Sequence, residues 1–207
     1  MSLDVLLAGV DPRWHGAGGD DLDDALLQRA RSSRLGRRLL AGALADGPAA
    51  HLLAPSPDGF SGLVGRWNRA RLSGLHRDLG VLAYAPAIRA EVGRDAVKRI
   101  KAVLGSSYLL ALDRSVWDAK VDAPLQGRLA STFAGALASG EGFGSQLFEA
   151  LELQGRGELQ SWARQREPAL ADWAKLVYPP VELPPPHLPE KPLLIVYTHH
   201  QNRAVAA

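Results

Sequence analysis

The sequence predicts an all-α protein: a single globular domain of about seven or eight helices with a proline-rich C-terminal extension. Three observations lead to this prediction. Apolar residues recur at helical spacing along most of the chain. Almost every interruption of that spacing is a glycine or a proline. The composition, 46% hydrophobic and 22% charged over 207 residues, is sufficient for the core of a soluble protein.

The first predicted helix spans residues 20–45 and follows an acidic leader, residues 1–19, that we expect to be flexible. Its first turn is rich in aspartate, which the positive end of the helix dipole favours: Asp20, Asp21, Asp23 and Asp24. Its apolar stripe is predicted to comprise Leu22, Leu26, Ala30, Leu35, Leu39 and Ala43. Gly36 permits a bend, and residues 54–62 form a turn-rich break that is the first predicted boundary.

The later helices are placed by proline at their starts and glycine at their ends. Pro86 and Pro124 lie where a helix begins, and Gly105 and Gly140 lie where one ends. The apolar spacing between such residues predicts helices at about residues 63–84, 86–105, 108–112, 124–140, 143–151, 159–163 and 168–178. With the first helix, they form the predicted helical domain, residues 20–178.

The remaining segment, residues 179–207, has a different composition. Seven of the fourteen prolines lie between Pro179 and Pro192, which predicts an extended polyproline II spacer. The short apolar tail that follows, residues 193–197, is rich in β-forming residues and is expected to be extended. Two interpretations stay open: the tail folds back onto its own domain, or it is a tethered peptide that docks on a partner.

The charge is unevenly distributed, although the net charge is only +2. Residues 1–24 carry a net charge of −5, residues 25–101 carry +9, and residues 102–178 carry −2. The overall balance argues against a general polyanion binder, but the basic segment, residues 25–101, is a candidate interface. The start of the chain lacks the cationic residues of a secretory signal, and no uncharged run is long enough to span a bilayer, so we expect a cytoplasmic protein.

No motif in the sequence predicts catalysis, a metal or a cofactor. The absence of cysteine excludes thiol nucleophiles and sites with cysteine ligands. The glycine-rich residues 16–21 lack the Lys and Ser/Thr of a phosphate-binding loop, and the histidines lack metalloprotease spacing. No Gly-x-Ser-x-Gly motif occurs. Asp113 and Asp118 have two interpretations, an acid pair or an acidic loop that caps the next helix.

Residues 79–112 carry a resemblance to a known family. A run of leucine, glycine and small residues, 79–87, leads into the pair Ile88 and Arg89, and is followed by residues 97–105, Tyr108, Ala111 and Leu112. This segment resembles the central helical segment of the SctK (YscK, PscK) family, an accessory component of the type III secretion sorting platform. The similarity extends more weakly to about Tyr178, and residues 11–14 resemble the Pro/Trp element near the family's start. The proline spacer and the tail depart from the family pattern.

The resemblance implies a non-enzymatic, all-helical adaptor at the cytoplasmic face of the inner membrane. Such an adaptor joins the cytoplasmic domain of the inner-membrane ring component to the pod protein of the sorting platform, which leads on to the ATPase. Contact with the membrane would be indirect, through the ring protein. It needs no cofactor, small-molecule substrate or catalytic residue.

The candidate partner-binding residues are basic side chains of the charged segment. Arginine is favoured at protein interfaces, which makes such a surface suited to an acidic partner. The candidates are Arg31, Arg34, Arg38, Arg69, Arg89, Arg94 and Lys98. Three alternatives remain: a helical nucleic-acid-binding regulator that uses residues 25–101, a small enzyme without recognisable motifs, and a basic face that is merely solvated.

Overall fold

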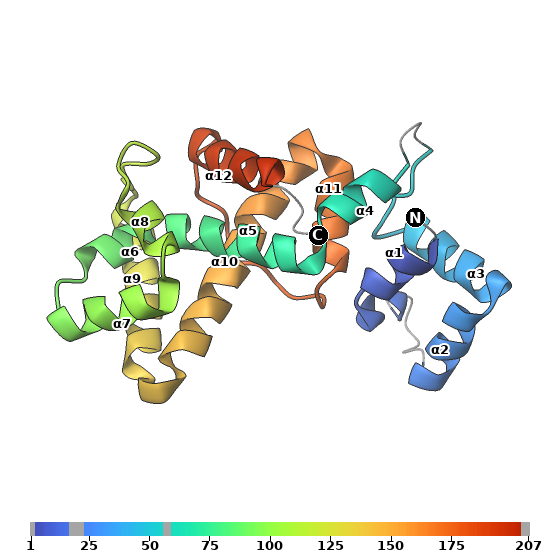
Figure 1. The fold of residues 1–207 in the computed structure, drawn as a ribbon, viewed down its shortest axis with the longest axis horizontal. Helices are drawn as coiled ribbons and strands as arrows, with labels where there is room; N and C mark the ends of the chain where they lie inside the picture. Colours follow the sequence, from blue (N-terminus) through green and yellow to red (C-terminus); the bar gives the residue numbers. More distant parts are fainter. Residues whose placement is uncertain (1–2, 17–22, 56–58, 204–207) are drawn as a thin grey trace. The chain divides into compact units, whose positions relative to one another are not determined.

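The computed structural model describes residues 3–16, 23–55 and 59–203, and all the regular secondary structure in them is helical. These residues form twelve α-helices and two short 3-10 helices, with no β-strand (Figure 1). The predicted all-α class is confirmed, but the helices outnumber the seven or eight expected. Asp20, Asp21 and Leu22 of the first predicted helix, with most of the glycine-rich stretch, lie outside the described residues.

Two compact units make up the chain. The first contains the described residues of Met1–Leu72 and Gln160–Glu182, and the second contains those of Ser73–Leu159 and Leu183–Ala204. The predicted boundaries after residues 19 and 178 do not coincide with this division. The first unit includes the described part of the leader, and the second includes most of the described tail.

The first unit contains six whole helices. They are α1 (Leu3–Gly9), η1 (Pro12–His15), α2 (Asp24–Ser32), α3 (Arg34–Ala45), α4 (Ser61–Arg66) and α11 (Pro168–Leu176). The leader was expected to be flexible, but residues 3–16 form α1 and η1, and the side chains of Leu6 and Leu7 are buried. Their burial gives a hydrophobic reason for order in this segment. Helix α3 packs against α2, α1 and η1 (Figure 1).

The predicted helix at residues 20–45 is two helices, and its buried face differs from the predicted one. The break lies at Ser33, whose hydroxyl accepts a hydrogen bond from the Gly36 amide at 2.9 Å and caps α3. The buried stripe comprises Leu27, Leu40 and Leu44, whereas the predicted core residues Leu26, Leu35 and Leu39 are exposed. This part of the prediction is wrong, because leucines occur in adjacent pairs and define two possible apolar faces.

Helix α11 organises the polar contacts of the first unit. The Trp173 indole donates a hydrogen bond to the Trp67 carbonyl at 2.6 Å. The Asp172 carboxylate accepts from the backbone amides of His51 and Leu52 at 2.8 and 3.1 Å. These bonds join α11 to chain segments more than a hundred residues away and satisfy polar groups that would otherwise be desolvated without partners.

The second unit contains most of two long helices, α5 (Arg69–Ala83) and α10 (Phe143–Arg166), and six whole helices. The whole helices are α6 (Ala85–Ala90), α7 (Arg94–Leu104), α8 (Ser107–Leu112), α9 (Ala123–Ala138), η2 (Gly140–Gly142) and α12 (Glu190–Asn202). Pro86 and Pro124 lie in the first turns of α6 and α9, and Gly105, with φ 56°, follows the last residue of α7. These three expected boundaries are confirmed.

Two other predicted boundaries differ from the structure. The helix expected at residues 63–84 is divided between α4 and α5, because the Asn68 side chain accepts a hydrogen bond from the Arg71 amide at 3.0 Å and caps a new helix. Conversely, the two helices expected around residues 143–151 and 159–163 are one continuous helix, α10. The glycines at 155 and 157 do not interrupt it.

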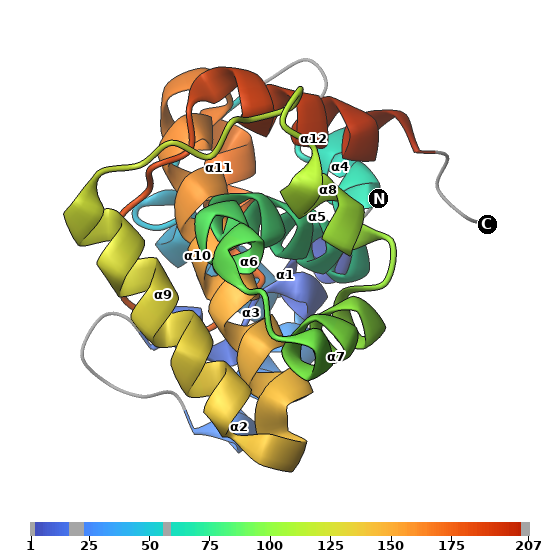
Figure 2. The same ribbon diagram turned by 90° about the vertical axis from the view of Figure 1, so that its left-hand side faces the viewer.

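Helices α5 and α10 approach each other closely in the second unit. A Cβ atom at Gly80 would collide with the backbone carbonyl of Leu151, and one at Gly155 would collide with the carbonyl of His76. Only glycine therefore fits at these two positions. Helix α9 lies beside the first half of α10, to which η2 connects it (Figure 2). Helix α6, whose residues 85–88 are buried, packs on α8 and α9.

The tail is helical where an extended peptide was expected. Residues 179–189 have no helical or strand hydrogen bonding, but residues 193–197 lie within α12, so the β-like prediction is wrong. Leu193, Val196, Tyr197 and His200 are buried at helical spacing, which a five-residue window is too short to reveal. Helix α12 packs on α5, as the interpretation of a tail that folds back requires.

Candidate partner-binding surfaces

The seven candidate basic residues fall into two groups: those that bond within their own unit and those that face solvent. Arg89 belongs to the first group. Its guanidinium donates hydrogen bonds to the carbonyls of Ala111 at 2.6 Å, Trp117 at 2.9 Å, Asp118 at 2.9 Å and Asp113 at 3.4 Å. Burial, and then the charge of Arg114, lower the pKa of Arg89, although an arginine stays protonated in proteins. Arg89 therefore holds the loop after α8, and four of its five N–H donors are used within its own unit.

Arg31 is also engaged within its unit. It is half-buried, and its guanidinium donates to the Val10 carbonyl at 3.2 Å, directly after α1. The neighbouring Arg37 donates to the Arg31 carbonyl at 3.0 Å and forms an ion pair with Asp4 at 2.7 Å. Arg31 and Arg37 thus help to fix α1 against α2 and α3, a role that the charge pattern alone does not indicate.

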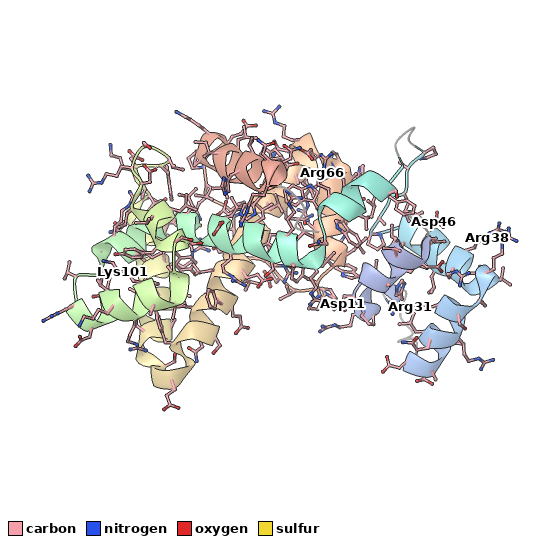
Figure 3. The ribbon with its side chains drawn as sticks, viewed as in Figure 1. Asp11, Arg31, Arg38, Asp46, Arg66 and Lys101 are labelled. Carbon is pink, nitrogen blue, oxygen red and sulfur yellow. The ribbon has the colours of Figure 1, made fainter. Side chains whose placement is uncertain are left out.

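Arg34 and Arg38 are exposed on successive turns of α3. Within the described ranges, neither forms a hydrogen bond or an ion pair. Figure 3 shows Arg38 on the outer side of α3, whereas Arg31 extends from α2 towards α1. Because the opposite side of α3 buries Leu40 and Leu44, these two cations are held facing outwards.

Arg94 and Lys98 form an equivalent pair on α7 in the second unit. Both are exposed, and the described residues provide them with no ion pair. The helix is strongly amphipathic, with Ile100 and Leu104 buried on its other side. Lys101, labelled in Figure 3, continues the basic side, and its ammonium lies 5.3 Å from the Tyr108 ring centroid. Helix α7 therefore presents cations along its exposed side.

Arg69 belongs to neither pair. It is exposed at the first residue of α5, within the first unit, and its guanidinium lies 5.4 Å from the centroid of the Tyr178 ring. A cation–π contact at an exposed site contributes about 0.5–1 kcal/mol, so it orients Arg69 without removing its charge from solvent. Of the seven candidates, the structure thus brings together Arg34 with Arg38, and Arg94 with Lys98.

Asp113 and Asp118 form loop contacts. The Asp113 carboxylate accepts from the Ser115 hydroxyl at 2.6 Å and from the Ser115 amide at 2.8 Å, and these bonds lower its pKa. The Asp118 carboxylate accepts from the Lys120 amide at 3.3 Å, and bonds from Lys120 lower its pKa as well. Both carboxyls are exposed and ionised, the reverse of a raised-pKa general acid. The N-cap of α9 is Asp122, so neither caps that helix.

A polar cluster lies between α5, α8 and α12, and no sequence motif predicts it. The Asp78 carboxylate accepts a hydrogen bond from the Ser107 hydroxyl at 2.7 Å and another from the His200 imidazole at 2.8 Å. In a catalytic triad the histidine lies between serine and aspartate and takes the proton from the serine. Here the aspartate occupies the middle, and the imidazole is not bonded to the hydroxyl. The arrangement is that of a structural tie between helices.

A second buried cluster holds the proline-rich segment to α10. The Glu158 carboxylate, almost completely buried, accepts from the amides of His187 and Leu188 at 3.0 Å. The His187 Nε2 lies 3.1 Å from the Ala83 carbonyl and therefore carries a proton. Gln154 donates to Glu158 at 2.7 Å. These bonds supply backbone partners that a proline-rich chain cannot obtain from a helix or a sheet.

Two cavities of the second unit are open to solvent. A hollow of about 600 Å³ is lined by residues of α9 and α10 with Tyr84 and Pro184. Another of about 510 Å³ lies beside the Asp78 cluster, lined mainly by α8 and α12. No cluster of three or more histidine, aspartate or glutamate side chains suited to a metal ion occurs among the described residues.

Two histidines have strongly perturbed titration. Complete burial, followed by the charges of Arg156 and His200, lowers the pKa of His76 to about 3. Partial burial and the charge of Arg31 lower the pKa of His15 to about 4. Each imidazole is therefore neutral in the folded protein at physiological pH, and its protonation is unfavourable to the fold.

In the part of the chain that the structure describes, no helix is both long and apolar enough to cross a membrane. Comparisons of the chain with family models, with curated proteins and with solved structures found no match.

Proposed function

We propose that the chain is a helical adaptor that binds two protein partners through separate basic surfaces and performs no catalysis. One observation carries this proposal. The exposed candidate cations form two pairs, Arg34 with Arg38 on α3 and Arg94 with Lys98 on α7, in two separately packed units. Each helix buries its opposite side in its own unit, so each pair is presented on a fixed support.

Acidic protein surfaces are the partners that such helices suit best. A guanidinium is planar and weakly hydrated, and it binds a carboxylate through two parallel hydrogen bonds. Paired arginines and lysines one turn apart also accelerate encounter with an acidic surface. The two surfaces give the chain two points of attachment, which is the minimum that a connecting protein requires.

The proposed place of the adaptor is the type III secretion sorting platform, at the cytoplasmic face of the inner membrane. This part of the proposal rests on the resemblance of residues 79–112 alone. The partners would be the cytoplasmic domain of the inner-membrane ring component and the pod protein. Within the segment, Gly80 permits the close approach of α5 to α10, and Arg89 holds the loop after α8, so both residues have structural roles in this chain.

Binding of single-stranded nucleic acid is less well supported. Such proteins stack bases on exposed aromatic rings beside a basic groove. Every phenylalanine, tryptophan and tyrosine of this chain is described, and all are buried or half-buried. The basic segment thus lacks a stacking surface, and direct measurement of DNA binding at low and high salt tests the alternative.

Affinity capture of the full chain with the purified ring domain and the purified pod protein tests the proposal. We expect each to be retained, with Arg34→Glu/Arg38→Glu weakening one partner and Arg94→Glu/Lys98→Glu weakening the other. Arg164→Glu, a single exposed charge reversal at the end of α10, is the control for an effect of surface charge alone. Retention of neither protein would overturn the assignment to the secretion system, and salt-sensitive DNA binding lost in the reversal variants would favour the regulator.

A further inference from the structure

The outer side of α3 carries an apolar stripe that the fold leaves uncovered. Leu35 is 69% exposed and Leu39 is 65% exposed, although both are large aliphatic side chains. Gly42 and Ala43, three and four residues after Leu39, continue the stripe by about one turn and are also exposed. The spacing i, i+4, i+7, i+8 is that of a helix face that normally packs against another helix.

The stripe cannot turn inwards, because α3 has a second apolar face that is already buried. Leu40 and Leu44 are 6% and 1% exposed and lie on the opposite side of the helix. Rotation of α3 to cover Leu39 would expose Leu40. Single exposed leucines are ordinary on protein surfaces, but two in register on one helix form a contiguous apolar patch, a feature of interaction sites.

The shape of the stripe admits a helix at short range. No heavy atom lies within 4 Å of the position that a Cβ atom would take on Gly42. Beyond Leu39 the surface therefore falls to a glycine and an alanine. Two protruding leucine side chains followed by two small residues form a ridge and a groove, against which the side chains of a second helix can pack.

The charge beside the stripe selects the partner. Arg34 and Arg38 lie along one edge, and among the described residues neither has an acidic neighbour within ion-pair distance. Helix α3 itself contains no acidic residue. An occupant must therefore combine an apolar face for Leu35 and Leu39 with carboxylates for the two guanidinium groups.

We infer that α3 binds an acidic amphipathic helix of a partner protein, through Leu35 and Leu39 in apolar contact and Arg34 and Arg38 in ion pairs. The inference rests on the proposed function in one respect, that α3 is a docking helix, and it adds the chemical class of the partner. A second copy of the chain fits less well, because two α3 helices face to face would oppose arginine to arginine.

The test measures binding of labelled synthetic peptides to the full chain by fluorescence anisotropy. The probe is a helical peptide with leucines at helical i, i+3/i+4 and i+7 spacing and glutamates at the flanks. One comparison peptide replaces the glutamates with lysines, and another has the acidic composition in scrambled order. The protein variants are Leu35→Ala/Leu39→Ala and Arg34→Glu/Arg38→Glu. The controls are two single exposed changes of the same kinds, Leu109→Ala in α8 and Arg164→Glu in α10.

We expect saturable binding of the acidic amphipathic peptide only, weakened about tenfold or more by each α3 variant and unchanged in both controls. Thermal unfolding of the variants at the wild-type temperature shows that the folds are intact. Equal binding of the scrambled peptide, or full binding by Leu35→Ala/Leu39→Ala, would overturn the inference.

Two further measurements identify a different occupant. A wild-type dimer in light scattering that becomes monomeric in Leu35→Ala/Leu39→Ala would assign the stripe to a second copy. Leucine-dependent sedimentation with vesicles of phosphatidylcholine and phosphatidylserine would assign it to a lipid surface. Either result overturns the inference. Peptide binding without retention of the ring or pod protein would instead uphold the α3 surface and reject the secretion-system assignment.

Discussion

The Asp78 carboxylate and the His200 imidazole form a hydrogen bond of 2.8 Å that joins α5 to α12 across 122 residues of sequence. His200 is 3% exposed, so its partner is not readily replaced by water. Burial by itself would raise the pKa of Asp78. The hydrogen bonds from His200 and Ser107, with the charges of His200 and His199, outweigh burial and hold the pKa below the ordinary value of 3.8.

Replacement of Asp78 by asparagine should destabilise the folded chain by about 1–3 kcal/mol at neutral pH, because it weakens two bonds to buried groups. A carboxyl with a depressed pKa stabilises the folded state above its unfolded pKa and loses this effect as pH falls through the folded value. The difference between wild type and variant should therefore shrink below pH 3.8. Urea unfolding at stepped pH measures it, with Glu149→Gln, an exposed carboxylate of α10, as control. Equal stability at pH 7 would contradict the prediction.

His76 should make the fold sensitive to mild acid. Its pKa is about 3 in the folded chain and 6.5 ordinarily, so the unfolded chain binds the extra proton between these values. The free energy of unfolding should accordingly fall as pH drops from 6.5 towards 3, with a limiting slope of about 1.4 kcal/mol per pH unit for one proton. His76→Gln should flatten this slope in urea titrations. An unchanged slope in that variant would show that His76 does not govern it.

The crossing of α5 and α10 should tolerate no side chain. Gly80→Ala and Gly155→Ala place a Cβ atom against the backbone of the other helix, and overpacking of this kind costs about 1–3 kcal/mol or more. Gly135→Ala in α9 is the matched control, since its Cβ would meet nothing within 4 Å. That change should stabilise by up to about 1 kcal/mol through helix propensity. Opposite signs in thermal unfolding are the expected result, and destabilisation by Gly135→Ala would refute the argument.

Arg89 should matter for folding and not for partner binding. Arg89→Met removes the donors for four carbonyls, and loss of one partner of a desolvated group costs about 1–3 kcal/mol. Arg89→Lys should recover only part of this, because a compact ammonium cannot reach the same set of acceptors. Chemical unfolding reports the loss, and affinity capture of the folded variants should match wild type. Weakened capture with normal stability would reverse this assignment.

Several helix ends could be predicted from the sequence, but the buried face of a helix could be predicted only where the helix has a single apolar face. Pro86, Gly105 and Pro124 mark helix ends correctly, because backbone geometry at proline and glycine is a local property. The buried face of α2 and α3 was not predictable in this way. Leu39 and Leu40 are adjacent, and both continue a helical stripe. Packing of α3 against α1, α2 and η1 decides which stripe faces inwards, and the other becomes the surface described above.

The contacts of the candidate site residues could not be predicted from the sequence either. Exposure of Arg34 and Arg38 agrees with the pattern of charge, but the pattern does not distinguish them from Arg89, whose acceptors are backbone carbonyls 22–29 residues away. Every residue has a backbone carbonyl, so the sequence does not show which carbonyls accept a hydrogen bond from Arg89. The tie between Asp78 and His200 is hidden for a related reason, since contact between distant side chains arises only from the completed fold.

The arrangement of each unit from separated chain segments has a consequence during protein synthesis. The first unit needs residues 160–182, and the second needs α12, which ends at Asn202. The chain around Trp67 must therefore wait during synthesis for α11, and α5 must wait for α10 and α12. At about 5–20 residues per second, synthesis of residues 160–202 takes on the order of a few seconds, long enough for chaperones to bind the nascent chain.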